Sequence, residues 1–295
     1  MRMQAKDKVF FICNYFIMCL LLIIVAYPLI IVLSTSFSSP EAIAAGRVKF
    51  LPVDFSLEGY KAIFGYKDIW VGYYNTIIYT IVGTILNVFM TIIAAYPLSR
   101  PDFKARNVIM FYFTITMFIS GGMIPTYLMM NTLHLLNTRW VMILPGAMSI
   151  FNVIITRTFF QSTIPRELLE SAKIDGCSDF KFIVHMVIPL SGAIIAVNAL
   201  FYAVAHWNSF FDAFIYLTDA DLMPLQIKMR TILLLNQIDI TMFATADPAM
   251  MNKRAEMAQL IKYALIVVAS APVLCIYPFV QKFFVKGVMI GSIKG

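Results

Sequence analysis

The sequence predicts an all-α integral membrane protein with six transmembrane helices and cytoplasmic termini. Three observations predict this fold class. First, the 295 residues are 60% hydrophobic and only 13% charged, a proportion that a soluble domain of this length cannot bury. Second, the chain contains six long stretches without a charged residue. Third, basic residues gather in alternate connecting segments, and no alternating apolar and polar strands suggest a barrel.

The six charge-free stretches set the expected spans. A helix of about 20 apolar residues crosses about 30 Å of hydrocarbon. Four of the stretches exceed that length, the sixth nearly reaches it, and the fourth is the shortest. The first is too long for a signal-peptide core and no small-residue cleavage site follows it, so we expect it to remain as a helix. We treat 1–295 as one transmembrane domain. The expected spans are 10–35, 73–98, 108–130, 139–160, 184–208 and 259–281.

Basic residues indicate the orientation. With the N-terminus inside, the inner segments carry more lysines and arginines than the outer ones, although the outer segments are longer. This is the positive-inside bias of cell-membrane proteins, so the net charge of +7 gives no reason to expect a nucleic-acid partner. The inner basic residues are Arg2, Lys6, Lys8, Arg100, Lys104, Arg106, Arg157, Arg166, Lys173, Lys181, Lys282, Lys286 and Lys294.

The sequence offers no pattern for catalysis, metal binding or ion coupling. The four cysteines show neither disulfide nor metal spacing, and the three histidines have no catalytic partner nearby in sequence. A GxxxxGK[ST] loop is absent, so we expect no ATP binding by this chain alone. No acidic residue lies in the middle of an expected span, which argues against a proton- or sodium-driven carrier. We therefore expect no catalytic residue, no metal and no cofactor in this chain.

One compact polar segment precedes the fifth expected span. It reads ELLESAKIDGCSDFKFIVHMVIPL over 167–190, and its residues predict two short helices with a break between them. Leu168 and Ala172 lie one turn apart on one face of the first helix. The expected signals are Thr163 as the first cap, Pro165 in the first turn, Gly176 as a left-handed stop, Ser178 and Asp179 as the second cap, and Pro189 as a kink.

This bent element has two interpretations from its residues alone. It is either an ordinary amphipathic loop at the membrane surface, or a rigid lever held by another protein. The small side chains of Ala172 and Gly176 permit close approach, and Glu170 offers a charged contact. Both interpretations stay open at this level.

The same segment resembles the EAA signature of binding-protein-dependent ABC importer permeases. That signature has Glu-Ala-Ala, then three residues and Gly, and ends about ten residues later in Ile-x-Leu-Pro. The chain departs from it at Ser171, Met186 and Ile188, all small or apolar exchanges. The matching residues are Glu170, Ala172, Asp175, Gly176, Phe180 and Pro189.

Further stretches are similar to the carbohydrate class of these permeases. They are LPVDFSLEGYKAIF, NTIIYTIVGTILNVFMTIIAAYPLSRPDFKARN and WNSFFDAFIYLTD. SGGMIPTYL and the ending QKFFVKGVMIGSIKG most resemble permeases of importers for oligosaccharides or polysaccharide fragments. The resemblance covers nearly the whole chain.

The resemblance implies a permease subunit of an ATP-driven importer that moves a carbohydrate through the membrane by alternating access. It implies a homologous second permease, two ATPase subunits that bind ATP and Mg²⁺, an extracytoplasmic sugar-binding protein and surrounding membrane lipid. The polar segment would be the cytoplasmic coupling helix between spans four and five, in the loop 161–182. The ATPase-coupling residues that it implies are Leu168, Glu170, Ala172, Asp175, Gly176 and Phe180.

A sugar path requires aromatic faces and amide or hydroxyl side chains. Such residues in membrane helices more often bond neighbouring helices, which is the alternative for each candidate. The substrate-path candidates are Asn75, Tyr127, Asn198, His206, Trp207 and Asn208.

Two other functions also stay open. They are an ion-coupled secondary carrier, and a membrane enzyme with a polar cluster at one membrane face.

Overall fold

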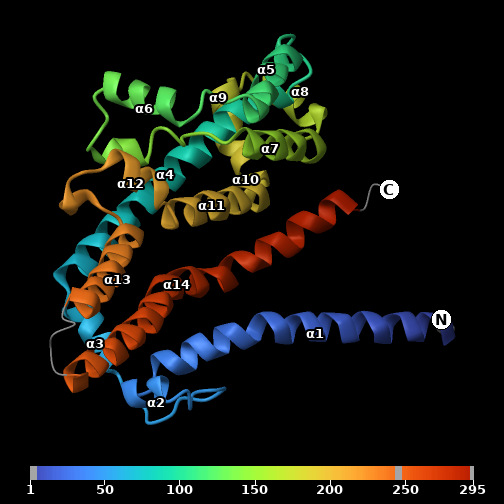
Figure 1. The fold of residues 1–295 in the computed structure, drawn as a ribbon. Helices are drawn as coiled ribbons and strands as arrows, with labels where there is room; N and C mark the ends of the chain where they lie inside the picture. Colours follow the sequence, from blue (N-terminus) through green and yellow to red (C-terminus); the bar gives the residue numbers. More distant parts are fainter. Residues whose placement is uncertain (1–4, 243–247, 293–295) are drawn as a thin grey trace. The chain divides into compact units, whose positions relative to one another are not determined.

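The computed structural model of the chain describes residues 5–242 and 248–292, and every regular element in these ranges is helical (Figure 1). The all-helical class predicted from the sequence is therefore confirmed. The elements are α1 (Ala5–Ser36), α2 (Pro40–Ala44), α3 (Glu58–Gly65), α4 (Lys67–Ser99), α5 (Arg106–Phe118), α6 (Met123–Thr132), η1 (Arg139–Met142), α7 (Ile150–Thr163), α8 (Arg166–Ile174), α9 (Asp179–Phe182), the π-helical turn η2 (Ile183–Val187), α10 (Ile188–Leu190), α11 (Gly192–Trp207), α12 (Phe211–Tyr216), η3 (Ala220–Leu222), α13 (Leu225–Met242) and α14 (Pro248–Ser292).

Within residues 5–242 and 248–292, three helices are long and apolar enough to cross a membrane. They are Lys8–Ser36 within α1, the whole of α4, and Ala255–Pro278 within α14. Each exceeds the length of about 20 residues that a helical span requires. They coincide with the expected spans 10–35, 73–98 and 259–281.

Two further candidate spans are bent. Helices α5 and α6 meet at 113°, and Asp179–Leu190 meets α11 at 85°. The first bend contains Gly122, whose φ of +87° lies in the region that favours glycine. The second lies at Ser191, just beyond Pro189, which has no N–H with which to continue a helix. The described chain thus contains up to five candidate spans if each bent pair counts as one.

The fourth expected span, 139–160, is not one helix. The turn η1 ends at Met142 and α7 begins only at Ile150. Pro145 lies in this interruption, and a proline disfavours the helical conformation of the residue before it. The 14 residues of α7 reach about 21 Å at about 1.5 Å per residue. Residues 139–160 therefore do not form one continuous helix, and the fourth span stays a prediction.

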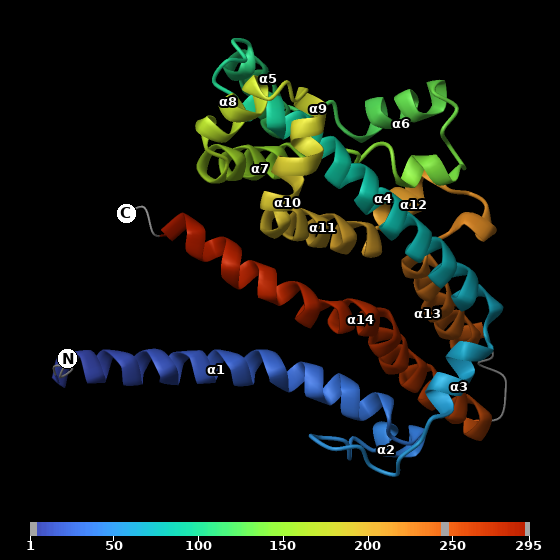
Figure 2. The same ribbon diagram turned by 180° about the vertical axis from the view of Figure 1, so that it is seen from behind.

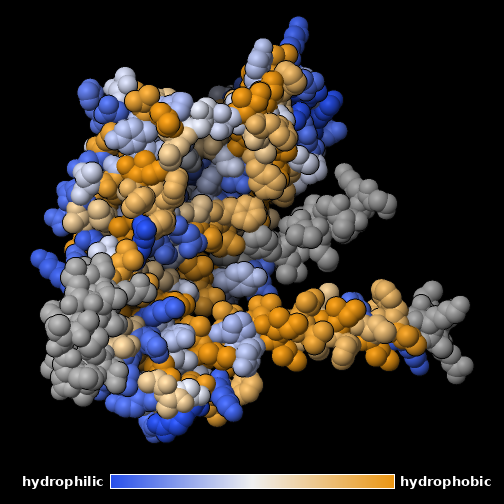
Figure 3. Space-filling model, in the orientation of Figure 1, coloured by the Kyte–Doolittle hydropathy of each residue, from blue (hydrophilic) through white to orange (hydrophobic). Residues whose placement is uncertain are grey.

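The chain divides into two compact units. The first comprises residues up to Trp70 together with Lys228–Pro272, and the second comprises Val71–Ile227 and the residues from Val273 onward. In the first unit, the side chains along α1 are exposed and mostly apolar (Figure 3). The same unit contains a short ion pair, with Lys228 Nζ 2.7 Å from Asp68 Oδ1.

Close packing of α3 against α14 stabilises the first unit. A Cβ atom added at Gly59 would lie 2.8 Å from Leu260 Cγ and 3.3 Å from Ala264 Cβ. We expect Gly59→Ala to destabilise the protein by about 1–3 kcal/mol, the usual penalty of overpacking. Thermal unfolding of the purified protein measures this. Gly65→Ala, in the same helix with nothing within 4 Å, is the control, and an equal loss in both variants would contradict the packing argument.

The second unit is organised around α4. Figures 1 and 2 both show α5, α7, α8 and α9 gathered at the Ser99 end of this helix. A hydrophobic cluster fills the space between them, with Tyr96, Phe160, Leu169 and Phe182 among its buried members. A second cluster, further along α4, includes side chains of α6, η1 and α12. Helix α8, which carries the signature residues, is thus packed on the end of α4.

Candidate functional site

Helix α8 ends in a Schellman motif at Gly176. This glycine has φ +73°, its N–H donates to the carbonyl of Lys173 at 3.1 Å, and the N–H of Cys177 donates to the carbonyl of Ala172 at 2.9 Å. These two bonds define the motif and satisfy carbonyls that the end of the helix leaves free. The predicted left-handed stop is confirmed, and it fixes the direction in which the chain leaves α8.

The start of α8 differs from the prediction. Thr163 was expected to cap this helix, but it is the last residue of α7, and no side chain caps α8. Pro165 explains the difference, because it restricts Ile164 to an extended conformation and so separates the two helices there. The prediction of a threonine cap was therefore wrong, whereas the proline boundary is clear.

The second short helix begins as predicted. Ser178 Oγ accepts a hydrogen bond from the N–H of Lys181 at 3.4 Å, and Asp179 is the first residue of α9. The chain then widens into the π-helical turn η2 before Pro189. A proline ring crowds the carbonyl four residues earlier, and a wider turn relieves that contact. The predicted kink at Pro189 is accompanied by the sharp bend two residues later, at Ser191.

Helix α8 has one face against the bundle and one face free. Leu169 and Ala172 are buried in the hydrophobic cluster at the end of α4, and Leu168 packs against the edge of that cluster. The ion pair between Lys173 Nζ and Asp102 Oδ2, at 3.4 Å, joins α8 to the segment between α4 and α5. Four of the signature residues are exposed on the other side: Glu170, Asp175, Gly176 and Phe180.

Two large apolar side chains stand out on this free side. Ile174 is 86% exposed and Phe180 is 73% exposed, so two large apolar side chains near the end of α8 are left uncovered by the residues that the structure describes. The sequence argument named Phe180 but missed Ile174. Its signal was available, because Ile174 lies about 200° around the helix from the buried Ala172 at about 100° per residue, on the otherwise polar face.

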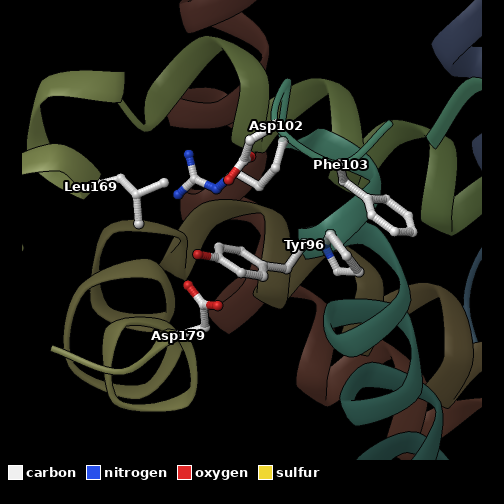
Figure 4. Close-up of a pocket in the computed structure, with 7 residues that line it drawn as sticks. Tyr96, Asp102, Phe103, Leu169 and Asp179 are labelled. Atoms are coloured by element: carbon white, nitrogen blue, oxygen red, sulfur yellow. The ribbon is translucent and has the colours of Figure 1, made fainter. Parts of the chain in front are cut away.

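Arg100, whose charge supports the predicted orientation, lines a cavity together with Leu169 of α8. Its side chain is only 7% exposed, and its guanidinium carbon lies 4.8 Å from the Tyr96 ring centroid and 5.4 Å from that of Phe182. The adjoining cavity has a volume of about 250 Å³. In Figure 4, Leu169, Tyr96 and Asp179 lie around it together with Asp102, and the Phe103 ring points away from them. Pro97 and Arg100 complete its lining.

Two of the substrate-path candidates, Asn75 and Asn198, use their side-chain N–H groups inside the chain. Asn75 donates from Nδ2 to the carbonyls of Asp221 and Met223, at 2.7 and 3.1 Å. Asn198 donates from Nδ2 to Thr156 Oγ1 at 2.7 Å. These amides are fully buried and hold helices and loops together, which is the commoner role of such residues in membrane proteins.

His206 belongs to a hydrogen-bonded chain between α4 and α11. Its Nε2 lies 2.9 Å from Asn87 Oδ1, and Asn87 Nδ2 donates to the carbonyl of Gly146. A Cβ atom on Gly83 would overlap the His206 ring, so the two helices approach closely at this point. A parallel link joins Thr91 Oγ1 to the Tyr202 hydroxyl at 2.7 Å. The interruption at 143–149 is therefore bound to the neighbouring helices by polar contacts.

The other candidates lie in different surroundings. Tyr127 is partly exposed and stacks on Tyr216, with 6.2 Å between ring centroids. Trp207 is buried near Tyr73, at a centroid distance of 6.2 Å. Asn208 ends α11 and is exposed, with Nδ2 donating to the carbonyl of Val204 at 2.9 Å. The structure does not bring the six candidates into one cluster.

Comparisons with known proteins give a consistent result. No family model matches the chain. The chain is 39% identical over 293 residues to the polygalacturonan/rhamnogalacturonan transport system permease protein YtcP of Bacillus subtilis, covering 98% of this chain and 100% of that protein. It is 40% identical over 295 residues to protein LplC of the same organism, covering 100% and 98%.

A solved structure also matches. It is a bacterial ABC transporter involved in the import of the acidic polysaccharide alginate, with a TM-score of 0.83 and 31% identity over 96% of this chain and 99% of that chain. Among the described residues, the long apolar helices are those of a polytopic membrane protein. The chain belongs to the permease subunits of ABC importers, in their carbohydrate class. This assignment rules against the ion-coupled carrier and the membrane enzyme.

Proposed function

We propose that this chain imports an oligosaccharide as one of two permease subunits of an ABC transporter. Two relatives are permeases of transport systems for polygalacturonan/rhamnogalacturonan and for arabinooligosaccharides. The matching solved transporter is involved in the import of alginate, an acidic polysaccharide. These names support a carbohydrate longer than a single sugar as the substrate.

For the topology we propose one transmembrane domain over 1–295, with six spans and both termini in the cytoplasm. The spans are α1, α4, the pair α5–α6, η1 with α7, the pair α10–α11, and α14. The fourth crosses as two helical pieces joined by the segment 143–149, which polar contacts bind to its neighbours. The charge bias of the connecting segments supports this orientation.

The proposal for coupling rests on one observation: α8 is fixed to the end of α4 on one face, and on its other face Ile174 is left 86% exposed. We assign loop 161–182 as the segment that docks on an ATPase subunit. Ile174, Phe180, Glu170, Asp175 and the backbone at Gly176 would form the docking surface. Ala172 and Leu168 would act from behind, by fixing α8 to the permease.

The mechanism follows from this two-sided packing. ATP and Mg²⁺ are bound by the ATPase subunits, and this chain supplies no cofactor of its own. The docking contacts between α8 and the ATPase differ in energy between the open and closed states of the ATPase dimer. Closure of the dimer therefore moves α8. The buried Leu169 and the Lys173–Asp102 pair would pass this displacement to α4 as a rigid-body motion. The spans then alternate between inward-open and outward-open states.

The assembly needs four other components. We propose a homologous second permease, two ATPase subunits and an extracytoplasmic sugar-binding protein, all within membrane lipid and without nucleic acid. For the sugar path we assign direct contact to the accessible Tyr127 and Asn208. Asn75, Asn198, His206 and Trp207 would shape the path by holding its helices in place.

The docking surface is tested by Ile174→Asp. The substitution removes the free energy gained by burying the Ile174 side chain in the docked complex, about 1.5–3 kcal/mol. A tenfold weaker affinity corresponds to about 1.4 kcal/mol. We therefore expect at least about tenfold less ATPase to co-purify at equal permease abundance. The matched control is Leu51→Asp, at a 75% exposed aliphatic residue of the first outer loop. Unchanged co-purification in the Ile174 variant would rule out this surface.

A further inference from the structure

The buried charge of Arg100 is not neutralised within the part of the chain that the structure describes. Its Nε and Nη2 atoms are buried without a hydrogen-bond partner, and none of the ion pairs found among the described residues includes it. The aromatic rings of Tyr96 and Phe182 attract the cation, and the Tyr96 side chain also bonds to it, but neither partner carries a negative charge. A buried unpaired charge carries a large desolvation penalty. An anion bound beside Arg100 would offset this penalty.

A cavity beside Arg100 has the lining that such an anion requires. Its volume is about 240 Å³, against about 30 Å³ for each molecule of liquid water, so a tetrahedral anion fits together with ordered water. The charged residues that line it are Arg100, Arg106 and Arg166, and no acidic residue lines it. Ser99 and Gln161 add polar side chains, and Pro101, Phe160 and Ile164 complete the wall.

Two acids lie in the neighbouring cavity, which Arg100 also lines. They are Asp102 and Asp179; neither forms an ion pair with Arg100 among the described residues, and Asp102 is paired with Lys173. A free phosphate carries more than one negative charge at neutral pH and presents several acceptor oxygens, and the phosphodiester of a lipid headgroup keeps one charge shared by two free oxygens. Guanidinium groups bind phosphate oxygens in a bidentate manner. Three arginines around one cavity therefore fit a phosphate better than a carboxylate.

We propose that this cavity binds a phosphate group, from an anionic phospholipid headgroup or from a free phosphate. The residues come from the ends of four helices, with Arg100 after α4, Arg106 starting α5, Gln161 in α7 and Arg166 starting α8. Basic pockets between membrane helices on the cytoplasmic side are suited to lipid headgroups. The bound phosphate holds the start of α8 against α4 and α5. The binding site itself does not depend on the ATPase-docking role.

The test uses the purified full-length chain and two separate ligands. Inorganic phosphate is titrated in detergent free of anionic lipid, with sodium chloride at matched ionic strength as the blank. In the second arm, nanodiscs of phosphatidylcholine are compared with nanodiscs that also contain phosphatidylglycerol. Thermal unfolding is the measurement in both arms. A shift with phosphate identifies a free anion, and a shift only with phosphatidylglycerol identifies a lipid headgroup.

Three variants give the test its specificity. We expect Arg100→Gln and Arg166→Gln each to weaken the apparent affinity about tenfold or more, because a hydrogen bond to a charged group contributes about 1.5–3 kcal/mol. Arg166 is exposed, so its variant remains informative even where Arg100→Gln fails to fold. Arg47→Gln, an exposed arginine paired with Asp54 at 3.1 Å, should leave the shift unchanged. No shift in either arm, or equal losses in all three variants, would overturn the proposal.

Discussion

Gly176→Val is expected to abolish coupled uptake while the permease still inserts in the membrane. The left-handed conformation at this residue costs a non-glycine side chain about 1–2 kcal/mol, and valine is branched at Cβ. The Schellman bonds from Gly176 and Cys177 would break, so the chain would leave α8 in another direction and displace Phe180. We expect uptake to fall about tenfold or more, while the ATPase activity is no longer stimulated by substrate. Transport and ATPase assays on the reconstituted complex measure both.

Gly46→Val is the matched control for backbone strain. Gly46 also has a left-handed conformation, with φ +64°, and both glycines have no other atoms within 4 Å of an added Cβ. It lies between α2 and α3 in the first unit and is not part of the proposed docking surface. A similar loss of stability but retained coupling is the expected result. Normal uptake by Gly176→Val at normal abundance would count against the coupling assignment.

Gly83→Ala is expected to have the largest effect on stability. The added Cβ would overlap three ring atoms of His206, so either the imidazole leaves its place or α4 and α11 move apart. In both cases the bond from His206 to Asn87 is lost. Overpacking costs about 1–3 kcal/mol and a hydrogen bond between membrane helices about 0.6–2 kcal/mol. A clearly lower unfolding temperature and reduced abundance in the membrane should follow.

A double-mutant cycle separates this overlap from a general effect on α4. His206→Ala removes the ring, so the pair Gly83→Ala with His206→Ala should be destabilised less than the sum of the single changes. Gly192→Ala, at the start of α11 with nothing within 4 Å, should change little. Strict additivity in the cycle would show that Gly83 and His206 do not meet.

The local features of the site were predictable from the sequence where one residue type decides the conformation. Gly176 and Ser178 behave as predicted, because a left-handed stop and a serine cap need only their neighbours in the chain. The predicted cap at Thr163 was wrong for a local reason as well, because Pro165, two residues later, sets the boundary between α7 and α8. Ile174 is not one of the signature residues, and only its place as an apolar residue on the polar face of α8 indicates a contact there.

The interrupted spans and the polar contacts were less predictable. Charge-free length predicts that a segment lies in the membrane, but it does not say whether Ser191 or Pro145 breaks the helix there. The hydrogen bond from Asn198 to Thr156 joins residues 42 positions apart in the chain, and hydropathy carries no information about such pairs. Arg100 illustrates the same limit, because its burial depends on Tyr96 and Phe182 meeting around it.

Helix α8 is proposed to face the cytoplasm and to be covered there by an ATPase subunit. The direct measurement is labelling of Ile174→Cys by a membrane-impermeant maleimide, in a chain whose four native cysteines are replaced. We predict no labelling in intact cells, rapid labelling in inverted vesicles stripped of the ATPase, and protection when the ATPase is added back. Labelling from outside intact cells, or equal labelling with and without the ATPase, would contradict the account.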